Sequence, residues 1–403
     1  MNLRELFYRY VAQTSPEPLA IEIERAEGIY LYTPEGKSYM DIISGISVSN
    51  VGHCNPEVVK AIHNQAEKYM HLLVYGEMIQ TPQVKLAQRL ASLLPENLSS
   101  VYFVNSGAEA IEGAIKLAKR FTHKTGLASC ENAYHGSTCG AMSLMGNDDF
   151  VQAFQPLLPE CCRIRFGVEE DLEKITTETA AFVVEVVQGE AGVRYADKKY
   201  WKKVRERCDE TNTLLVFDEI QTGFGRTGTM FAFEQTGVVP DIITLAKAMG
   251  GGMPVGAFIA SKEIMSALTF NPVLGHMTTF GGHPLCCAAA LASVDIIERD
   301  KLYKTAEEKG KLFELQLANL PQVKTFRRKG LMIALDFNSR AFNFHVIHKC
   351  LENGILSDWF LFCDAAMRIS PPLIITKEEI KEVCRVIKEI ILSADITDNK
   401  ETA

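Results

Sequence analysis

Lys247 stands at the end of a short apolar run, Ile242 to Ala246, which predicts a buried strand, and a triple glycine follows closely. Burying an unpaired ammonium group costs several kcal/mol or forces the amine to lose its proton. The amine is therefore either a surface group just beyond the strand or a reactive group held in a site. A reactive lysine forms Schiff bases with carbonyl compounds, so the second alternative predicts a specific chemistry.

A candidate anion site lies in "VYFVNSGAEAIEGAIKLAKRF", which predicts an apolar strand followed by a helix. The first amides of a helix lack partners within the helix, and the helix dipole favours an anion there. Gly107 and Ala108 allow close approach and Ser106 adds a hydroxyl, so a phosphate fits this turn. The alternative is that Ser106 simply caps the helix.

Two further loops offer a carboxylate and an aromatic ring. Asp218 ends the apolar run of "LLVFDEIQTGFGRTG", where an acid can pair with a cationic ligand nitrogen or cap a helix. Tyr134 and His135 precede Gly136 in "ENAYHGSTCG", where an aromatic ring can stack on a flat ligand or pack against the protein. The sequence has no HExxH motif and no tight His/Cys/Asp cluster, so we expect no metal.

One kind of ligand would use all four groups: a planar, phosphorylated heteroaromatic aldehyde with a cationic ring nitrogen. Pyridoxal 5′-phosphate has this structure. Lys247 would form a Schiff base with its aldehyde and later act as a general base, and Asp218 would keep the ring nitrogen protonated. We therefore predict that the cofactor is pyridoxal 5′-phosphate.

The elements that must position these loops alternate between apolar runs and helical patterns from about residue 80. The runs at 101–104, 180–187, 213–218 and 241–246 predict an α/β fold, in which helices cover both faces of a mostly parallel sheet. Ligands then gather at the carboxyl ends of the strands. After about residue 290, one long helical stretch, a strand and two more helices predict a smaller α+β domain. We expect residues 1–45 to join this small domain, 46–290 to form the large cofactor-binding domain, and 291–403 to complete the small one.

The 403 residues, 47% apolar and 23% charged, are typical of a globular protein with two domains. A net charge of −8 argues against nucleic acid or an anionic membrane as the main partner. No apolar run is long enough for a transmembrane helix, and the N-terminus lacks the apolar core of a signal peptide. Eleven scattered cysteines without a CxxC motif indicate free thiols in a reducing compartment, so we expect a cytoplasmic protein.

Seven motifs occur in order along the chain: "NSGAEA", "YHG", "VQGEAGV", "DEIQTGFGRTG", "LAKAMGGGMPVGA", "TTFGGHPLCCAAA" and "RISPPL". With them the sequence resembles the class III pyridoxal-phosphate-dependent aminotransferases of fold type I along nearly its whole length. It resembles most closely the acetylornithine/ornithine and other ω-aminotransferases. The resemblance implies ping-pong transfer of an amino group from an ω-amino or α-amino donor to a 2-oxo acid. It also implies a homodimer with the site at its interface.

The resemblance implies a role for each residue of these motifs. Lys247 would carry the Schiff base and the proton transfer, and Asp218 would pair with the pyridine nitrogen. The other expected cofactor contacts are Ser106, Gly107 and Ala108 at the phosphate, Tyr134 and Ile220 on the two ring faces, His135 beside Tyr134, Gln221 at the ring hydroxyl, and Thr279 at the phosphate of the partner subunit.

Substrate recognition is expected at Arg368 of "MRISPPL", which resembles the arginine that pairs with an α-carboxylate; without the resemblance it would be an ordinary exposed arginine or a structural ion pair. Glu190 resembles the glutamate that holds this arginine while the ω-amine of a diamino substrate reacts. Ile46 is expected to line an apolar entrance. Ornithine-like members usually carry arginine after "HG", where this chain has Ser137. Either another cation binds the distal carboxylate of 2-oxoglutarate, or the acceptor is a monocarboxylate such as pyruvate.

Two other classes of function stay open on the same residues. An aminomutase, decarboxylase or racemase uses the same cofactor site, and a requirement for a stoichiometric amino acceptor distinguishes transamination from these reactions. A non-enzymatic regulator on this scaffold is expected to lack the lysine or the aspartate, and this chain has both.

Overall fold

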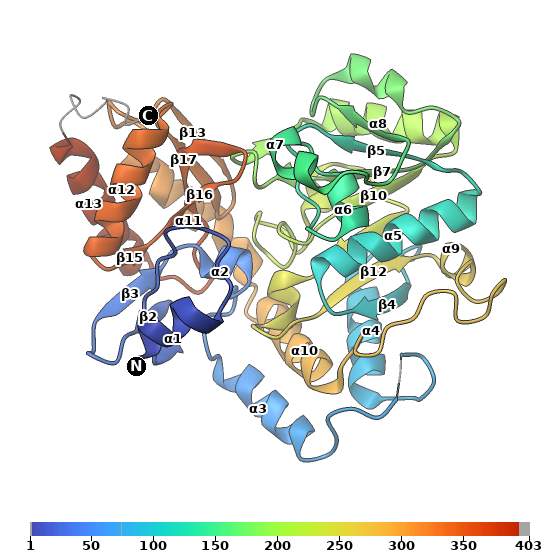
Figure 1. Cartoon of the computed structure of the whole chain (residues 1–403), viewed down its shortest axis with the longest axis horizontal. Coiled ribbons are helices and arrows are strands. Elements are labelled where there is room, and N and C mark those ends of the chain that lie inside the picture. Colours follow the sequence, from blue (N-terminus) through green and yellow to red (C-terminus); the bar gives the residue numbers. More distant parts are fainter. Residues whose placement is uncertain (1, 74, 395–403) are drawn as a thin grey trace.

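A seven-stranded sheet forms the centre of the computed structural model, which describes residues 2–73 and 75–394 (Figure 1). In spatial order its strands are β4 (Ser100–Val104), β12 (Gly256–Ala260), β11 (Ile242–Leu245), β10 (Leu214–Asp218), β7 (Thr179–Glu185), β5 (Gly126–Cys130) and β6 (Cys161–Ile164). Strand β12 is antiparallel to both of its neighbours, because the connection from β11 is too short for a crossover. The other pairs are parallel, which confirms the expected mostly parallel sheet.

The apolar runs locate four of these strands, since β4, β7, β10 and β11 lie where the sequence predicts them. Strands β5, β6 and β12 were not predicted. The sequence of β5, "GLASC", is made mostly of small residues and gives little hydrophobic signal, although its last four residues are buried. Its neighbours β6 and β7, rather than its own side chains, place it in the sheet.

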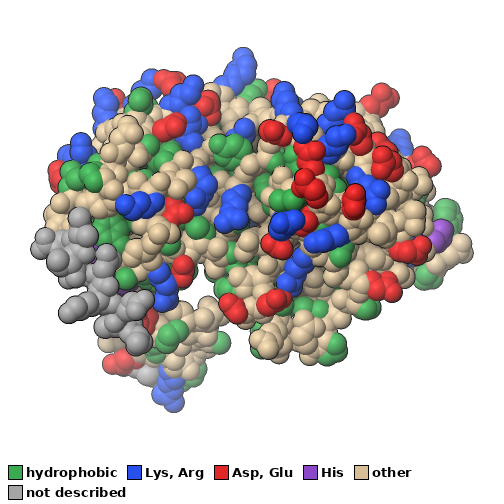
Figure 2. All heavy atoms as spheres, turned by 90° about the horizontal axis from the view of Figure 1, so that it is seen from above, with side chains coloured by type: hydrophobic (Ala, Val, Ile, Leu, Met, Phe, Trp, Pro, Cys, Tyr) green, Lys and Arg blue, Asp and Glu red, His purple; other side chains and the backbone are tan. Residues whose placement is uncertain are grey.

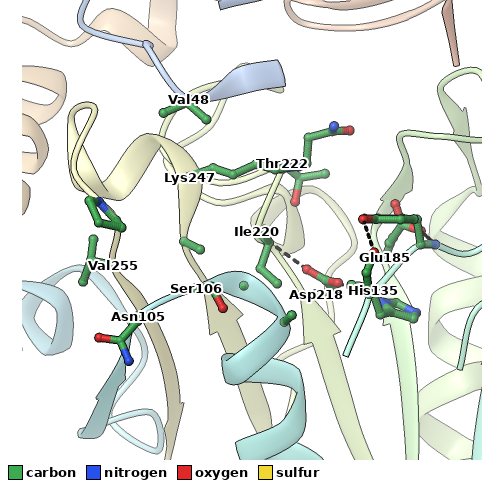
Figure 3. A pocket seen from close by; sticks show the side chains of 18 of the residues that line it. Val48, Asn105, Ser106, His135, Glu185, Asp218, Ile220, Thr222, Lys247 and Val255 are labelled. Carbon is green, nitrogen blue, oxygen red and sulfur yellow. Dashed lines mark hydrogen bonds and ion pairs between the residues drawn. The ribbon is translucent and has the colours of Figure 1, made fainter. Parts of the chain in front are cut away.

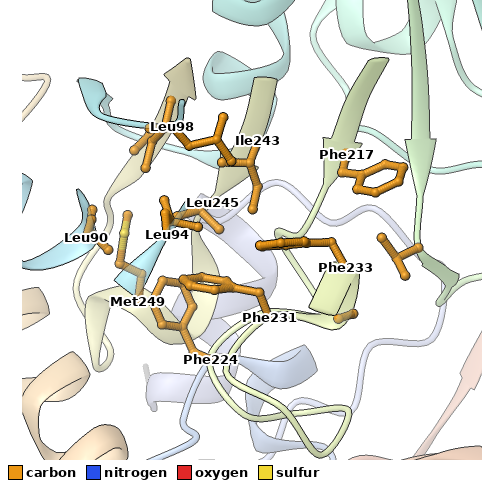
Figure 4. Close-up of a cluster of buried hydrophobic side chains, with 14 of the residues drawn as sticks. Leu90, Leu94, Leu98, Phe217, Phe224, Phe231, Phe233, Ile243, Leu245 and Met249 are labelled. Carbon is orange, nitrogen blue, oxygen red and sulfur yellow. The ribbon is translucent and has the colours of Figure 1, made fainter. Parts of the chain in front are cut away.

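Helices cover both faces of the sheet, because alternate residues of each strand point to opposite sides. Phe182, Val184 and Phe217 pack on one side, in a core that Figure 4 shows in part. Ala181 and Val216 pack on the other side. The helices that contribute to the first core are α3 (Pro56–Ala66), α4 (Thr81–Leu93), α8 (Lys198–Thr211) and α10 (Pro284–Arg299). Those of the second core are α5 (Gly107–Thr122), α6 (Cys139–Ser143) and α9 (Lys262–Ser266).

A second assembly combines the two ends of the chain around its own apolar core. One sheet has the order β1 (Arg25–Glu27), β2 (Tyr30–Tyr32), β3 (Ser38–Asp41), β15 (Ile355–Leu356), so that an N-terminal strand pairs with a C-terminal one. The other has the order β13 (Thr325–Lys329), β14 (Met332–Asp336), β17 (Cys363–Ile369), β16 (Asp358–Phe360). Helices α11 (Leu302–Leu317), α12 (Arg340–Glu352) and α13 (Lys377–Ser393) pack with these sheets, as the N- and C-terminal colours of Figure 1 show.

The remaining elements are short. They are α1 (Leu3–Tyr10), α2 (Ser44–Ser47), α7 (Asp148–Val151), β8 (Val187–Gln188), β9 (Arg194–Tyr195) and the 3₁₀ turns η1 (Gln152–Phe154), η2 (Glu169–Lys174), η3 (Ala232–Gln235) and η4 (Lys247–Gly250).

The long helical stretch expected after residue 290 is two helices, so this expectation is wrong in detail. The chain breaks between α10 and α11, where Lys301 has a positive φ of 51° that no continuous helix allows. The proposed domain boundary after residue 290 falls inside α10, whose Val294 and Ile297 pack in the core of the large sheet. The domain boundaries themselves stay a proposal.

Arg226 connects the two assemblies through hydrogen bonds to main-chain and side-chain oxygens. Its side chain is fully buried, and Nη1 donates to the carbonyl oxygens of Leu331 at 3.2 Å and Pro371 at 2.5 Å. Nη2 donates to Ser44 Oγ at 3.1 Å and to Asn50 Oδ1. Burial lowers the pKa of Arg226 to about 9. A guanidinium bonded this way fixes the N-terminal and C-terminal segments against the loop after β10.

The surface carries charges of both signs. On the face in Figure 2, lysine and arginine side chains intermingle with aspartate and glutamate, and no broad field of one sign covers it. Within residues 2–73 and 75–394, no helix has the length and apolar character that crossing a bilayer requires.

Candidate active site

A cavity of about 510 Å³ opens at the carboxyl ends of β4, β7, β10 and β11 (Figure 3). This is the edge of a parallel sheet at which ligands are expected. Ten of the residues singled out in the sequence line it: Ser106, Gly107, Ala108, Tyr134, His135, Glu190, Asp218, Ile220, Gln221 and Lys247. The fold thus brings together loops that are up to 141 positions apart in the chain, from Ser106 to Lys247.

The turn from β4 into α5 supplies the anion cradle. Ser106 caps the helix, because its hydroxyl accepts a hydrogen bond from Glu109 N–H at 3.2 Å, and it also lines the cavity, so the two alternatives of the sequence coexist. A Cβ on Gly107 would lie 2.9 Å from Ile220 Cγ2, so a larger residue there would displace the Ile220 side chain from its place in the cavity wall. The uncapped amides of the first helical turn therefore face space that a phosphate can occupy.

Asp218 occupies the end of β10 and pairs with a buried histidine from another loop. Its Oδ2 lies 2.7 Å from Nδ1 of His135, and its Oδ1 accepts from Ile220 N–H at 2.9 Å. A turn follows Asp218, so the helix-cap alternative does not hold. Burial alone would lower the pKa of His135, but the hydrogen bond and charge of Asp218 raise it on balance. The pair therefore holds a proton beside the cavity.

Lys247 begins the short turn η4 directly after β11, and Figure 3 shows its side chain extending over the cavity near Thr222. Its φ of 45° is unusual for a residue with a side chain, and such strain of about 1–3 kcal/mol is typical of functional positions. Burial lowers the pKa of its amine, an effect that Glu190 partly opposes. Among the described residues its Nζ has no hydrogen bond or ion pair, which leaves the amine available to react.

The loop that carries Tyr134 is fixed by a carboxylate that the sequence did not single out. Glu112 of α5 accepts hydrogen bonds from Thr138 Oγ1 at 2.6 Å and from Gly140 N–H at 2.9 Å. The loop also approaches α5 closely, since a Cβ on Gly136 would lie 2.6 Å from that of Ala108. In this loop, the Tyr134 hydroxyl and Ser137 Oγ are 3.1 Å apart.

Arg368 and Glu190 form a buried ion pair at the side of the cavity. Arg368 Nη1 and Nη2 lie 2.9 and 2.6 Å from the two carboxylate oxygens, and the guanidinium packs 4.6 Å over the ring of Phe360. Arg368 is only 3% exposed, so the alternative of an ordinary surface arginine does not hold. Burial opposes ionisation of Glu190, but Arg368 lowers its pKa on balance. The guanidinium of such a bidentate ion pair could bind the carboxylate of a ligand in place of Glu190.

Two expected site residues, Ile46 and Thr279, do not line the cavity. Arg368 does not line it either, but it pairs with Glu190, which does. Ile46 is half-buried in the kinked helix α2, with a φ of 64°, and its neighbour Val48 lines the cavity instead. Thr279 is exposed in the segment before α10 and does not line this cavity.

Several lining residues were missed, chiefly Glu185. It ends β7 next to Asp218 of β10, and its side chain is buried. Burial raises its pKa to about 7. The signal was present as a charge inside the apolar run "AAFVVEVV". The other missed lining residues are Val48, Asn105, Gly136, Thr222, Ala246, Gly252, Met253, Pro254 and Val255, with Ser137 considered only for its missing charge.

The sequence matches the family described as Aminotransferase class-III over residues 10–391. The chain belongs to the class-III aminotransferases. It is 43% identical to the acetylornithine aminotransferase of Methanocaldococcus jannaschii over 385 residues, which cover 92% of this chain and 94% of that protein. Identity to the acetylornithine aminotransferase of Methanosarcina mazei is 42%, with 94% of each chain covered.

A solved structure extends this comparison to the fold. The ornithine aminotransferase of Toxoplasma gondii, described with partial occupancy of pyridoxal phosphate at its active site, has a TM-score of 0.88 and 32% identity. The match covers 97% of this chain and 94% of that one. The expected fold type I is confirmed, and this aminotransferase uses pyridoxal 5′-phosphate. The residues of the cavity fit that cofactor: a glycine-lined helix start, a carboxylate with a protonated partner, and an unpaired amine.

Proposed function

We propose that this aminotransferase moves the ω-amino group of an acetylornithine- or ornithine-like donor to a 2-oxo acid. The observation that carries the proposal is the Arg368–Glu190 pair beside the amine of Lys247. A 2-oxo acid brings a carboxylate to this point, whereas a donor reacting through its ω-amine brings none. Glu190 neutralises Arg368 for the donor and releases it for the oxo acid. The names of the relatives support this class of donor.

A half-reaction experiment tests the proposal. The purified protein is loaded with pyridoxal phosphate, and N-acetylornithine or ornithine is added without acceptor. The absorbance of the bound cofactor should change to that of its aminated form, and a 2-oxo acid should restore it. Release of carbon dioxide, or isomerisation of the donor without an acceptor, would identify the decarboxylase or aminomutase alternative instead.

The cavity residues have distinct proposed roles. Pyridoxal phosphate supplies an aldehyde that condenses with amines and a ring that withdraws electrons from the carbon beside the nitrogen. Lys247 would take the proton from the substrate carbon that bears the amino group and return it to the carbon of the cofactor's aldehyde, since burial lowers its pKa and its Nζ is unpaired. Asp218, held by His135, keeps a proton at the ring nitrogen. The remaining proposed contacts are Ser106, Gly107 and Ala108 to the phosphate, Tyr134 and Ile220 to the ring faces, and Gln221 to the ring hydroxyl.

The acceptor is proposed to be a monocarboxylate such as pyruvate. Among the described residues that line the cavity, Lys247 is the only lysine or arginine. Ser137 offers a hydroxyl that Tyr134 already engages, which supplies no charge for a second carboxylate. A second carboxylate would therefore lie beside the acidic side chains of the cavity without a cation from this chain.

We also propose a homodimer in which Thr279 reaches the cofactor phosphate of the partner. Two segments next to each other carry many exposed apolar side chains, and Tyr75 N–H binds Thr278 O at 3.3 Å between them. The exposed apolar residues are Met70, Leu72, Leu73, Met78 and Ile79 in one segment and Phe270, Val273, Leu274, Met277 and Phe280 in the other. An apolar patch of this extent is typical of a surface covered by a protein partner. A cytoplasmic location is proposed on the eleven free cysteines.

A further inference from the structure

Glu185 makes two main-chain contacts that connect different parts of the cavity. Its Oε1 accepts a hydrogen bond from Tyr134 N–H at 3.0 Å, and its Oε2 accepts one from Gly189 N–H at 2.9 Å. Tyr134 is the residue proposed to contact one face of the cofactor ring, and Gly189 directly precedes Glu190. One buried carboxylate thus holds both loops at the end of β7.

Within residues 2–73 and 75–394, no side chain forms an ion pair or a hydrogen bond with this carboxylate. The charged groups that face it are His135, already paired with Asp218, together with Asp218 itself and Lys247. Its two oxygens are therefore satisfied by main-chain N–H groups. Above its pKa of about 7, the ionised carboxylate accepts from both donors at once, whereas a carboxamide turns an N–H group toward one of them, so the comparison below is made at about pH 8.5.

We propose that Glu185 is a positioning residue that fixes the Tyr134 loop and the Gly189–Glu190 turn relative to each other. The inference rests on the roles proposed above for Tyr134 and Glu190. As a consequence, the ring of Tyr134 and the carboxylate of Glu190, which pairs with Arg368, keep a constant distance from each other. Loss of one acceptor at Glu185 would displace both.

Glu219 provides a matched control. It is fully buried, its pKa is likewise raised by burial to about 7, and it accepts hydrogen bonds from Ala232 N–H at 3.0 Å and Phe233 N–H at 2.6 Å. Its carboxylate points to η3 and also accepts a hydrogen bond from the hydroxyl of Thr222, but Glu219 itself does not line the cavity. E185Q and E219Q therefore make the same chemical change in two buried sites, of which one belongs to the cavity.

The test compares both variants with the wild type as holoenzymes. One measurement is the visible circular dichroism of bound pyridoxal phosphate, and the other is the ratio of kcat/KM for pyruvate to that for acetaldehyde, which lacks the carboxylate. E185Q should weaken the dichroism and lower the ratio by about tenfold to a hundredfold, the range that small displacements in a site produce. E219Q should change neither by more than about twofold.

The outcomes separate this inference from the proposed function. An E185Q protein that matches E219Q in both measurements, or differs in only one, overturns the coupling. If E185Q does not fold, E185D decides the question, since its shorter side chain keeps the charge but cannot span both donors; wild-type values in E185D would overturn the inference. A wild-type protein that binds the cofactor but transfers no amino group contradicts the proposed function, and the dichroism still tests Glu185.

Discussion

Two hydrogen bonds of 2.9 and 2.6 Å join the guanidinium of Arg368 to the carboxylate of Glu190, although the two residues are 178 positions apart in the chain. Arg368 lies in β17 of the C-terminal sheet, and Glu190 lies in the turn between β8 and β9, which form a separate two-stranded sheet. Leu361 N–H also donates to Glu190 at 3.1 Å, so the carboxylate stays in place when the guanidinium is engaged elsewhere. Arg368 can therefore exchange its hydrogen bonds to Glu190 for hydrogen bonds to a substrate carboxylate.

E190Q should separate the two half-reactions. Without the carboxylate, Arg368 stays exposed to anions, so the half-reaction with the 2-oxo acid should keep its rate or gain. The half-reaction with the ω-amine donor should slow by about tenfold or more, because an unpaired buried charge remains beside the donor. Stopped-flow absorbance of the bound cofactor measures both. Equal slowing of the two half-reactions would contradict the exchange.

K247A should abolish turnover. A positioned proton-transfer group contributes about 10²–10⁴-fold to rate, and loss of the amine that we propose to bind the cofactor aldehyde adds to this. Steady-state assay of pyruvate consumption measures the loss. K262A, in the exposed first turn of α9, is the control and should keep wild-type activity. A K247A protein with full activity would disprove the assignment.

S137R should change the choice of acceptor. A guanidinium in the loop that carries Tyr134 adds a charged hydrogen-bond donor for a second carboxylate, which is worth about 1.5–3 kcal/mol. We expect KM for 2-oxoglutarate to fall by about tenfold relative to that for pyruvate. S137A, which removes only the hydrogen bond to Tyr134, should leave the ratio of the two KM values unchanged. A wild-type protein that already prefers 2-oxoglutarate would argue against the proposed monocarboxylate.

I79D should weaken the proposed dimer. Ile79 is 94% exposed within the apolar patch, and a charge there would be buried without a partner on association. Sedimentation should detect a shift toward monomer, together with weaker retention of pyridoxal phosphate. Leu315, which is 75% exposed on α11 outside the patch, supplies the control L315D. If both variants sediment alike, the patch is not the interface.

The stability of the protein should depend on the ionisation of Glu219. Burial raises its pKa from an ordinary 4.5 to about 7, so the folded state binds this proton more tightly than the unfolded state does. The stabilisation is complete below about pH 4.5 and is lost as the pH rises through about 7. Thermal unfolding should show a smaller fall in Tm across this range in E219Q than in the wild type. The exposed control E67Q should follow the wild type.

Much of the fold follows from hydrophobic pattern alone. The runs that end at Val104, Asp218 and Leu245 are apolar enough to predict strands, and the residues after them predict the cavity. The strands that were missed, such as β5, are rich in small residues and depend on their neighbours for burial. The break at Lys301 was missed because a positive φ leaves no mark in an amphipathic pattern.

Some residues of the site could likewise be predicted from the sequence, and others could not. Residues within motifs, such as Lys247 and Asp218, were found because their types and their order are informative. Glu112 was missed, since an acid on a helix usually faces solvent, and its acceptor role depends on a loop 26 positions away. Thr279, expected at the cofactor phosphate, lies outside the cavity of the single chain, and its proposed role in a homodimer stays a prediction.

The separate origins of the two halves of the site have an evolutionary consequence. Most residues that line the cavity follow the carboxyl ends of strands of the large sheet, whereas Arg368 comes from a strand that packs on another core. Mutations in the C-terminal strands can therefore change which substrates bind, while the cavity residues that follow the strands of the large sheet stay the same. Such an architecture lets one ancestral chemistry diversify among many metabolites.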